Sequence, residues 1–144
     1  MTSMFVSLPV TDLERAKAFY TAIGFTINPL FSDHNAAYVV VEDDHSYFML
    51  MVRDFFQSHS DRPIGDPATT VMSATLIFLD SREAVDAAVA AGIAAGGSAP
   101  RPATDFGFMY QYQLIDPDGH VLEFGHMDPA AIEQGPEASM VQQA

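Results

Sequence analysis

The chain contains no cysteine. Disulfide bonds, zinc sites with thiolate ligands and thiol nucleophiles are therefore excluded. A protein without disulfides has no need of an oxidising compartment, so the expected location is the reducing cytoplasm. The sequence also has no glycine-rich phosphate loop, no nucleophile elbow and no Ser/His/Asp arrangement in a recognisable context, which removes the most easily identified enzyme classes.

Basic residues are scarce. Six lysines and arginines stand against 19 acidic residues, and the formal net charge is −13. Binding to nucleic acid needs a basic surface that neutralises phosphates, and anionic membranes repel an acidic protein, so we expect neither as a partner. The charge favours encounter with cationic small molecules, although acidic surfaces more often serve solubility.

Long apolar runs are missing as well. No stretch approaches the ~20 apolar residues of a membrane helix, and Met1–Phe5 lacks the basic and apolar regions of a signal peptide. Apolar residues nevertheless make up 49% of the 144 residues and charged residues 17%. This balance predicts one compact domain, or two small halves that share an interface.

Two parts of the chain share one layout: a strand-like run, a polar cap, an amphipathic helix and a glycine stop. They span residues 5–24 and 72–97. Thr11 and Asp80 are each followed three residues later by a glutamate, which is the spacing of a capping box at a helix start. Apolar residues recur at helical spacing in both parts, at Leu13, Ala16, Tyr20 and Ile23 and at Val85, Ala88, Val89 and Gly92.

Strand-like runs follow each helix, including a short one near residues 98–101, and the turn Asp116–Gly119 favours a closing hairpin. The predicted class is α+β, with two βαβββ modules whose curved mixed sheets lie around a small-molecule cavity. The expected boundaries are a first module over residues 4–52, a linker over 53–70, a second module over 71–127 and a C-terminal tail over 128–144.

Three segments resemble a known family. Leu8–Tyr20 is similar to the run V-x-D-L-x-x-(S/A)-x-x-F-Y that opens vicinal-oxygen-chelate proteins, the glyoxalase/bleomycin-resistance/extradiol-dioxygenase superfamily. Ile23–Phe25 matches the usual LGF, and Asp116–Phe124 resembles the closing hairpin DPDGxxxE. The resemblance implies the glyoxalase/bleomycin-resistance fold, a small-molecule ligand and a homodimer. Phe106–Tyr110 further resembles a branch of predicted lactoylglutathione lyases.

The resemblance also implies one divalent metal held between strands of the two modules. Glu123 occupies the ligand position of the last strand. The other three positions hold Phe5, Met49 and Ala74 (or Ser73 if the register shifts by one), which are poor ligands for such ions. A catalytic metal site needs about three protein ligands, so a complete site is not expected. Glu123 remains the catalytic candidate, as a general base or as the single retained ligand.

Strand parity places Phe5 and Ser7 on the cavity side of the first strand. An aromatic-rich segment adds Phe108 and Tyr110, for which ordinary core is the alternative. The predicted pocket residues are therefore Phe5, Ser7, Met49, Ala74, Phe108 and Tyr110. On the last strand, the same parity puts His120 and His126 on the face opposite Glu123, so a shared metal site of these three is not expected.

Three functions stay open at this point. The first is a glyoxalase-like lyase or isomerase that abstracts a proton with Glu123 and has an atypical or absent metal site. The second is a metal-free binding protein of the bleomycin-resistance type, which sequesters a cationic drug in grooves of a dimer. The third is a structural or regulatory module with a filled cavity. The resemblance favours a glyoxalase-like protein whose catalytic activity is left open.

Overall fold

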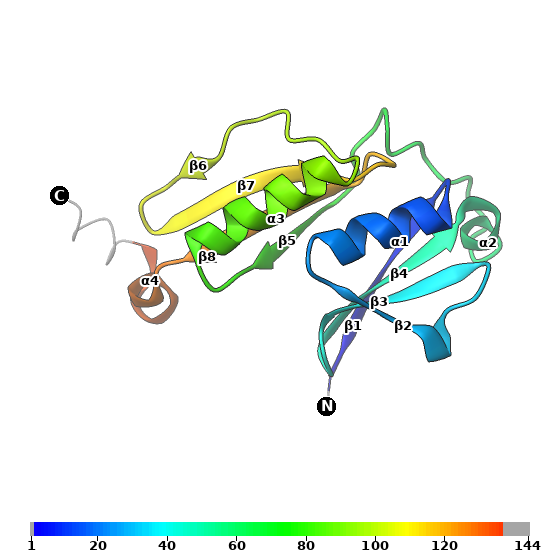
Figure 1. The fold of residues 1–144 in the computed structure, drawn as a ribbon, viewed down its shortest axis with the longest axis horizontal. Helices are drawn as coiled ribbons and strands as arrows, with labels where there is room; N and C mark the ends of the chain where they lie inside the picture. The colour runs from blue at the N-terminus through cyan, green and yellow to red at the C-terminus, as the bar shows by residue number, and fades with distance from the viewer. Residues whose placement is uncertain (1, 137–144) are drawn as a thin grey trace.

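A computed structural model describes residues 2–136 of the chain and contains two four-stranded mixed sheets, each with a helix packed on it. The first sheet has the order β1-β4-β3-β2 and the second the order β5-β8-β7-β6; the pairs β1–β4 and β5–β8 are parallel and the others antiparallel. This arrangement confirms the predicted α+β fold (Figure 1). The strands are β1 (Met4–Val10), β2 (Thr26–Asn28), β3 (Ala36–Glu42), β4 (Ser46–Val52), β5 (Ala74–Phe78), β6 (Thr104–Asp105), β7 (Met109–Ile115) and β8 (Val121–Met127).

The helices are α1 (Leu13–Ala22), α2 (Arg53–Gln57), α3 (Arg82–Ala94) and α4 (Pro129–Gln134), with a short 3-10 helix, η1 (Pro29–Phe31). The cap of α1 is Asp12, whose side chain accepts a hydrogen bond from the Arg15 N–H, and not Thr11 as predicted. Thr11 is engaged elsewhere, because its own N–H donates to Asp118 at 2.8 Å. The cap of α3 is likewise one residue later than predicted, at Ser81.

Each helix buries the predicted apolar stripe against its own sheet. Val85, Ala88, Val89 and Gly92 of α3 are all buried. Gly92 permits close packing, because a Cβ there would lie 2.4 Å from Cδ2 of Leu114 on β7. The helix-facing side chains of the strands complete a core of buried residues, with Leu8, Val10, Val39, Phe48, Leu50, Leu114, Leu122 and Phe124 among them.

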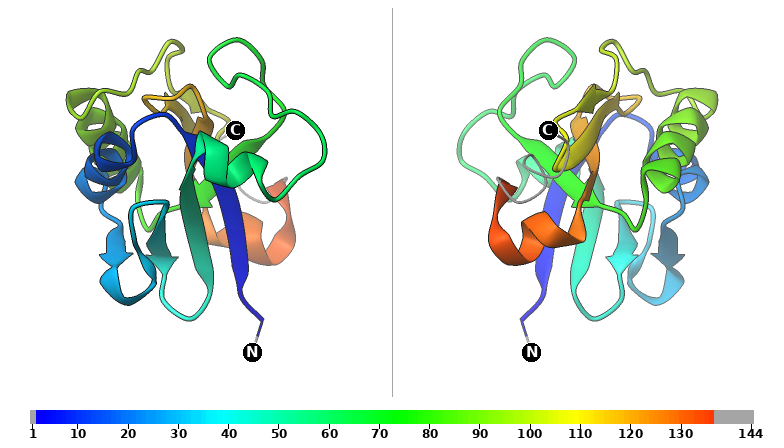
Figure 2. Two further views of the ribbon diagram at one scale, coloured as in Figure 1. Left: turned by 90° about the vertical axis from the view of Figure 1, so that its right-hand side faces the viewer. Right: turned by 90° about the vertical axis from the view of Figure 1, so that its left-hand side faces the viewer.

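The two modules lie side by side and do not face each other. α1 and α3 run along one side of the sheets (Figure 1), and the segment between the modules and α4 lie on the other side (Figure 2). Each sheet therefore has one face covered by α1 or α3, which we call the helix-covered face, and an opposite face not covered by these two helices, which we call the helix-free face. Within the described residues, no helix is long and apolar enough to cross a membrane.

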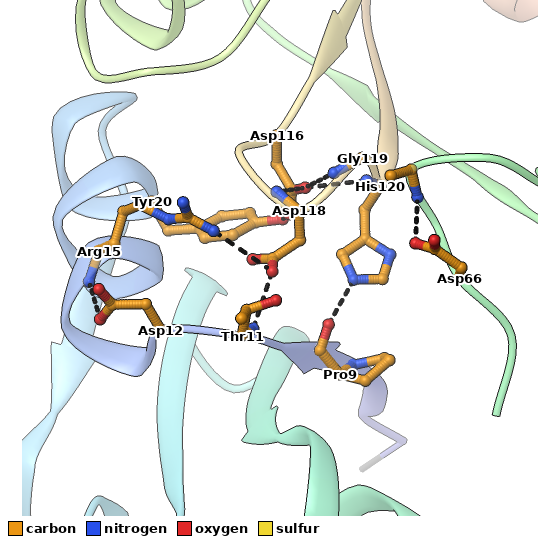
Figure 3. Close-up of polar contacts among 11 residues, drawn as sticks. Pro9, Thr11, Asp12, Arg15, Tyr20, Asp66, Asp116, Asp118, Gly119 and His120 are labelled. Atoms are coloured by element: carbon orange, nitrogen blue, oxygen red, sulfur yellow. Dashed lines mark hydrogen bonds and ion pairs between the residues drawn. The ribbon is translucent and has the colours of Figure 1, made fainter.

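Polar contacts tie the modules together at the turn between β7 and β8 (Figure 3). Asp116 and Asp118 of this turn are both buried. Asp116 accepts a hydrogen bond of 2.8 Å from the hydroxyl of Tyr20 on α1, and Asp118 contacts Thr11 and, at 3.5 Å, the guanidinium of Arg15. The turn that closes the second module thus also anchors the start of the first helix.

Some predicted local elements differ. The strand expected near residues 98–101 is reduced to one bridge between Ser98 and Ile115, and the edge strand β6 comes later. The stretch read as a linker, residues 53–70, contains the short helix α2. Part of the predicted tail forms α4, whereas residues 137–144 lie outside the described residues.

Candidate functional site

Glu123 lies on the helix-free face of the second sheet. Its backbone pairs with Leu76 on β5 and with Gln113 on β7, and its flanking residues Leu122 and Phe124 are buried on the helix side. The carboxylate accepts a hydrogen bond from the side-chain amide of Gln111, two positions along β7 on the same face. Glu123 is half-buried, and none of the cavities described within residues 2–136 is lined by it.

The other predicted pocket residues fall into separate groups. Phe5, Ser7 and Met49 share the helix-free face of the first sheet, where Ser7 pairs with Met49 across β1 and β4. Ala74 is on the helix-free face of the second sheet, exposed, and paired with Val121. The structure therefore brings Ala74 and Glu123 together on one sheet, and Phe5, Ser7 and Met49 together on the other.

Tyr110 and Phe108 do not join either group. Tyr110 lies on the helix-covered side of β7, where its hydroxyl donates to Asp86 of α3 at 2.5 Å and the guanidinium of Arg82 lies 5.3 Å from its ring. The hydrogen bond to Asp86 is the main cause that raises the pKa of Tyr110 to about 12. Phe108 is half-buried in the loop before β7, with its ring 6.1 Å from that of Phe106.

The two histidines of the last strand make structural contacts. Nε2 of His120 is 2.7 Å from the Pro9 carbonyl, and Nδ1 of His126 is 2.9 Å from the Leu79 carbonyl. A carbonyl only accepts hydrogen bonds, so each of these nitrogens carries the proton and donates it. The His120 ring therefore joins the second module to β1, and the His126 ring joins β8 to the residue that follows β5.

The donors for the divalent metal implied by the resemblance do not fit such an ion. Of the four corresponding positions, only Glu123 has an oxygen or nitrogen ligand in its side chain; Phe5 and Ala74 have none, and Met49 offers a thioether. In the described part of the chain, no group of three or more His, Cys, Asp or Glu side chains could hold a metal ion. No chemical step is therefore assigned to a metal at this position.

A cavity of about 370 Å³ opens along the seam between the modules. Its walls come from the neighbouring edges of the two sheets, with mostly apolar side chains from β1, β4 and β5. Met4, Leu76 and Phe78 at this seam are 65%, 42% and 51% exposed, which is unusual for large apolar side chains. Glu42 and His45 supply polar groups to the lining.

Four aromatic rings form a continuous patch beside this seam, which we call the aromatic patch: Phe5, Phe31, Tyr38 and Tyr47. Phe5 stacks on Tyr47 at a centroid distance of 4.6 Å and meets Tyr38 edge-on at 5.1 Å, while Phe31 packs at 5.5 Å on Tyr38. Tyr47 also lines the seam cavity. Phe5 and Phe31 are 43% and 66% exposed, so the patch presents ring surface to solvent.

The sequence prediction included only Phe5 of these four. Strand parity alone puts Tyr47 two residues before Met49 on the same face, so this residue was within reach of the same reasoning. Strand parity could not have identified Tyr38 and Phe31, because their position beside Phe5 depends on the register of β3 with β4 and on η1.

The patch lies near an acidic turn. Glu42 ends β3, and Asp43 and Asp44 follow it in the turn to β4, where Asp44 adopts a left-handed conformation with φ of 61°. The pKa of Tyr38 is raised mainly because its hydroxyl is desolvated, then by Tyr47, and further by the charges of Asp43 and Asp44. The field of the acidic turn therefore reaches the rings.

Known proteins share the fold. The family described as "Bleomycin resistance protein-like N-terminal" matches residues 2–42. Hypothetical protein SA1046 from S. aureus has 26% identity and a TM-score of 0.73 over 88% of this chain and 94% of its own. A glyoxalase/bleomycin resistance protein from Albidiferax ferrireducens T118 has 27% identity and a TM-score of 0.65 over 88% of this chain and 98% of its own.

A glyoxalase-related enzyme from Fulvimarina pelagi has a TM-score of 0.74 at 20% identity, over 90% of this chain and 89% of its own, which is a likeness of fold. No curated protein sequence matches the chain. Two βαβββ modules with one helix-free face per sheet define a protein of the glyoxalase/bleomycin-resistance fold. This fold is that of the vicinal oxygen chelate superfamily, and the match of residues 2–42 to a bleomycin-resistance family supports the resemblance found in the sequence.

Proposed function

We propose that the chain is a glyoxalase-like protein that binds a small aromatic cation without a metal ion. The observation that carries this function is the aromatic patch, whose exposed rings Phe5 and Phe31 lie near the acidic turn. Exposed aromatic faces attract cations through the ring quadrupole, by about 0.5–1 kcal/mol for each contact at an exposed site. The net charge of −13 adds long-range attraction for the same ligands.

The seam cavity supplies the rest of such a site. Its apolar lining is suited to the uncharged body of a ligand whose cationic group rests on the aromatic patch, and Tyr47 belongs to both surfaces. Glu42 contributes a carboxylate to the lining of the seam cavity. The match of residues 2–42 to the bleomycin-resistance family supports this function, because that range contains Phe5, Phe31 and Tyr38. We also propose that the protein forms a homodimer and is located in the cytoplasm.

Calorimetry on protein treated with a chelator tests the proposal. The probes are benzyltrimethylammonium, a simple aromatic cation, and bleomycin, the cationic drug of the resistance family. We expect Phe5→Leu and Phe31→Leu to weaken binding of benzyltrimethylammonium about threefold each and about tenfold together, because each change replaces a ring by an alkyl group of similar bulk. Phe106→Leu is the matched control, since Phe106 is 47% exposed and lies in the other module.

Two results would overturn this function. One is the absence of saturable binding of benzyltrimethylammonium, and the other is an equal loss of affinity in the Phe5 variant and the Phe106 control. Failure of bleomycin alone, with benzyltrimethylammonium bound as expected, would remove that drug as a ligand and retain the class of aromatic cations.

A second candidate function, a lactoylglutathione lyase-like activity, is favoured by one observation: Glu123 keeps the position of the family's last-strand carboxylate and faces away from the helix. The carboxylate would serve as a general base on a small oxygenated substrate. Formation of lactoylglutathione from methylglyoxal and glutathione tests this activity. Glu123→Gln should abolish it, whereas Glu133→Gln, which changes an exposed acid on α4, should not. No product from the unmodified protein would eliminate the candidate.

A further inference from the structure

A second cavity, of about 350 Å³, lies where the end of β1, the start of β8 and the segment between the modules meet. Its walls are the stretch of chain between α2 and β5, the end of β1 and the start of β8. Phe56, Ile64 and Met72 belong to its apolar lining, and Arg62, Ser73 and His120 are among its polar groups. It shares none of its lining residues with the seam cavity.

The segment between the modules forms one wall of this cavity, and its own side chains hold its conformation. The side-chain amide of Gln57 donates to the carbonyls of Ser60 and Arg62, at 3.2 and 2.7 Å, and accepts from the N–H of Ile64 at 3.0 Å. Arg53 donates to the carbonyl of Gly65 at 3.3 Å. Compact loops held by their own side chains are frequently functional, because they keep a binding surface in shape before a ligand arrives.

The same segment packs closely against the β7–β8 turn. Gly119 has φ of +105°, and a Cβ there would lie 2.5 Å from the carbonyl oxygen of Pro67 and 2.7 Å from Ala68. Only glycine allows this approach of two backbones. The cavity is therefore fixed between two segments that are about fifty residues apart in the chain, roughly the separation of Pro67 and Gly119.

The electrostatics of the cavity contrast with those of the whole protein. No aspartate or glutamate lines it, in a chain with 19 acidic residues. Among the acids of the packed segments, Asp66 accepts hydrogen bonds within its own loop and Asp116 and Asp118 are buried in the turn. Asp61, next to Arg62 in the sequence, is exposed and does not line the cavity. Arg62 has no acidic partner among residues 2–136, whereas Arg15, Lys17 and Arg82 each have one.

The mouth of the cavity adds apolar surface. Met72 is 93% exposed and the adjacent Val71 is 67% exposed, and both line the cavity. A lone arginine on a surface attracts any anion, but the apolar lining selects among anions for those with an apolar body.

We propose that this cavity binds a small organic carboxylate with an apolar or aromatic body. The Arg62 guanidinium pairs with the carboxylate, for which its planar fork of N–H donors is suited, and Phe56, Ile64 and Met72 contact the body of the ligand. The site differs from the proposed cation site in location and in the sign of its charge, so the two proposals are tested independently of each other.

Amide chemical shifts of ¹⁵N-labelled protein, titrated with benzoate at low salt, test the proposal. We expect saturable shifts at Arg62, Ser73 and His120. Benzyl alcohol, which has the ring without the charge, should bind at least about fivefold more weakly, and sulfate should not compete with benzoate. Arg62→Gln should weaken benzoate binding at least about fivefold. Arg101→Gln, which removes the same charge from an exposed arginine outside the cavity, should change it less than about twofold.

Met72→Glu gives an independent check, because this side chain is almost fully exposed and its replacement leaves the core intact. A negative charge at the mouth of the cavity should weaken the binding of benzoate at least about fivefold. The proposal is overturned if Arg62→Gln and Arg101→Gln have equal effects, if the benzoate shifts do not saturate, or if sulfate displaces benzoate. The last outcome would mean an unselective anion contact only.

Discussion

The hydroxyl of Tyr20 on α1 donates a hydrogen bond of 2.8 Å to Oδ2 of Asp116, and the two residues are 96 positions apart in the chain (Figure 3). The other carboxylate oxygen of Asp116 accepts from the N–H groups of Asp118, Gly119 and His120. Burial is the largest influence on this carboxyl and raises its pKa above 3.8, while the Tyr20 hydroxyl acts in the opposite direction.

Tyr20→Phe should therefore destabilise the protein by about 1–3 kcal/mol, because it leaves a buried carboxylate oxygen without its donor. Urea unfolding monitored by circular dichroism measures this loss. Tyr112→Phe is the control: its hydroxyl has no hydrogen-bond partner among the described residues, and a change below about 0.5 kcal/mol is expected.

The effect of Tyr20→Phe should also depend on pH. Because the folded-state pKa of Asp116 is raised, the stability that this group contributes is fully present below the unfolded pKa and is lost as pH rises through the folded pKa. The Tyr20 hydroxyl favours the ionised carboxyl, so its removal raises that pKa further and costs more when the group is charged. Free energies of unfolding between about pH 4 and pH 8 should diverge with increasing pH. A penalty that is constant over this range would contradict the assignment.

Gly119→Ala should destabilise the protein more than Gly24→Ala. Both glycines have positive φ, +105° and +114°, and alanine at either position meets the backbone strain of about 1–2 kcal/mol. Only at Gly119 does the new Cβ also collide with backbone, at Pro67 and Ala68; nothing lies within 4 Å of a Cβ at Gly24. We expect an additional cost of about 1–3 kcal/mol in thermal or urea unfolding. Equal costs would show that the segment yields without penalty.

Asp86→Asn should return the pKa of Tyr110 from about 12 towards 10.0, because the hydrogen bond and the charge of Asp86 are the main specific causes of the rise. Ultraviolet titration of tyrosinate follows the change. Since the folded-state pKa is raised, the stabilisation is present below about pH 10 and is lost as pH rises through about 12. Glu83→Gln, which removes another acid from α3, is the control and should leave the high-pH titration unchanged.

Removal of metal should have no effect on stability. The donor set around Glu123 does not fit a divalent ion, so dialysis against a chelator should leave Tm unchanged, and added Zn²⁺ or Mn²⁺ should raise it by less than about 1 °C. A ligand that bound the folded chain at 100 times its Kd would add about 2.7 kcal/mol. The prediction is contradicted if Tm increases with metal concentration and increases less in the Glu123→Gln variant, because Glu123 would then bind a divalent ion.

Much of the fold was readable from local patterns. The buried stripe of α3 follows from helical spacing, and Gly24 and Gly96 adopt positive φ after the helix ends as their positions suggested. Strand parity placed Phe5 and Ser7 on one face of β1, and both are exposed there, whereas Leu8 and Val10 on the opposite face are buried in the core. These features depend on neighbours within a few residues, and the amino-acid order alone determines them.

Other features depend on partners far away in the chain. Thr11 has the spacing of a cap, but its N–H is taken by Asp118 from the other module, and Asp12 caps α1 instead. The aromatic patch needs the register of β3 with β4, and the side-by-side placement of the modules decides that Glu123 does not line a described cavity. Local propensity leaves several such arrangements equal in free energy, and long-range pairing determines which one forms. Only the tertiary structure therefore decided these features.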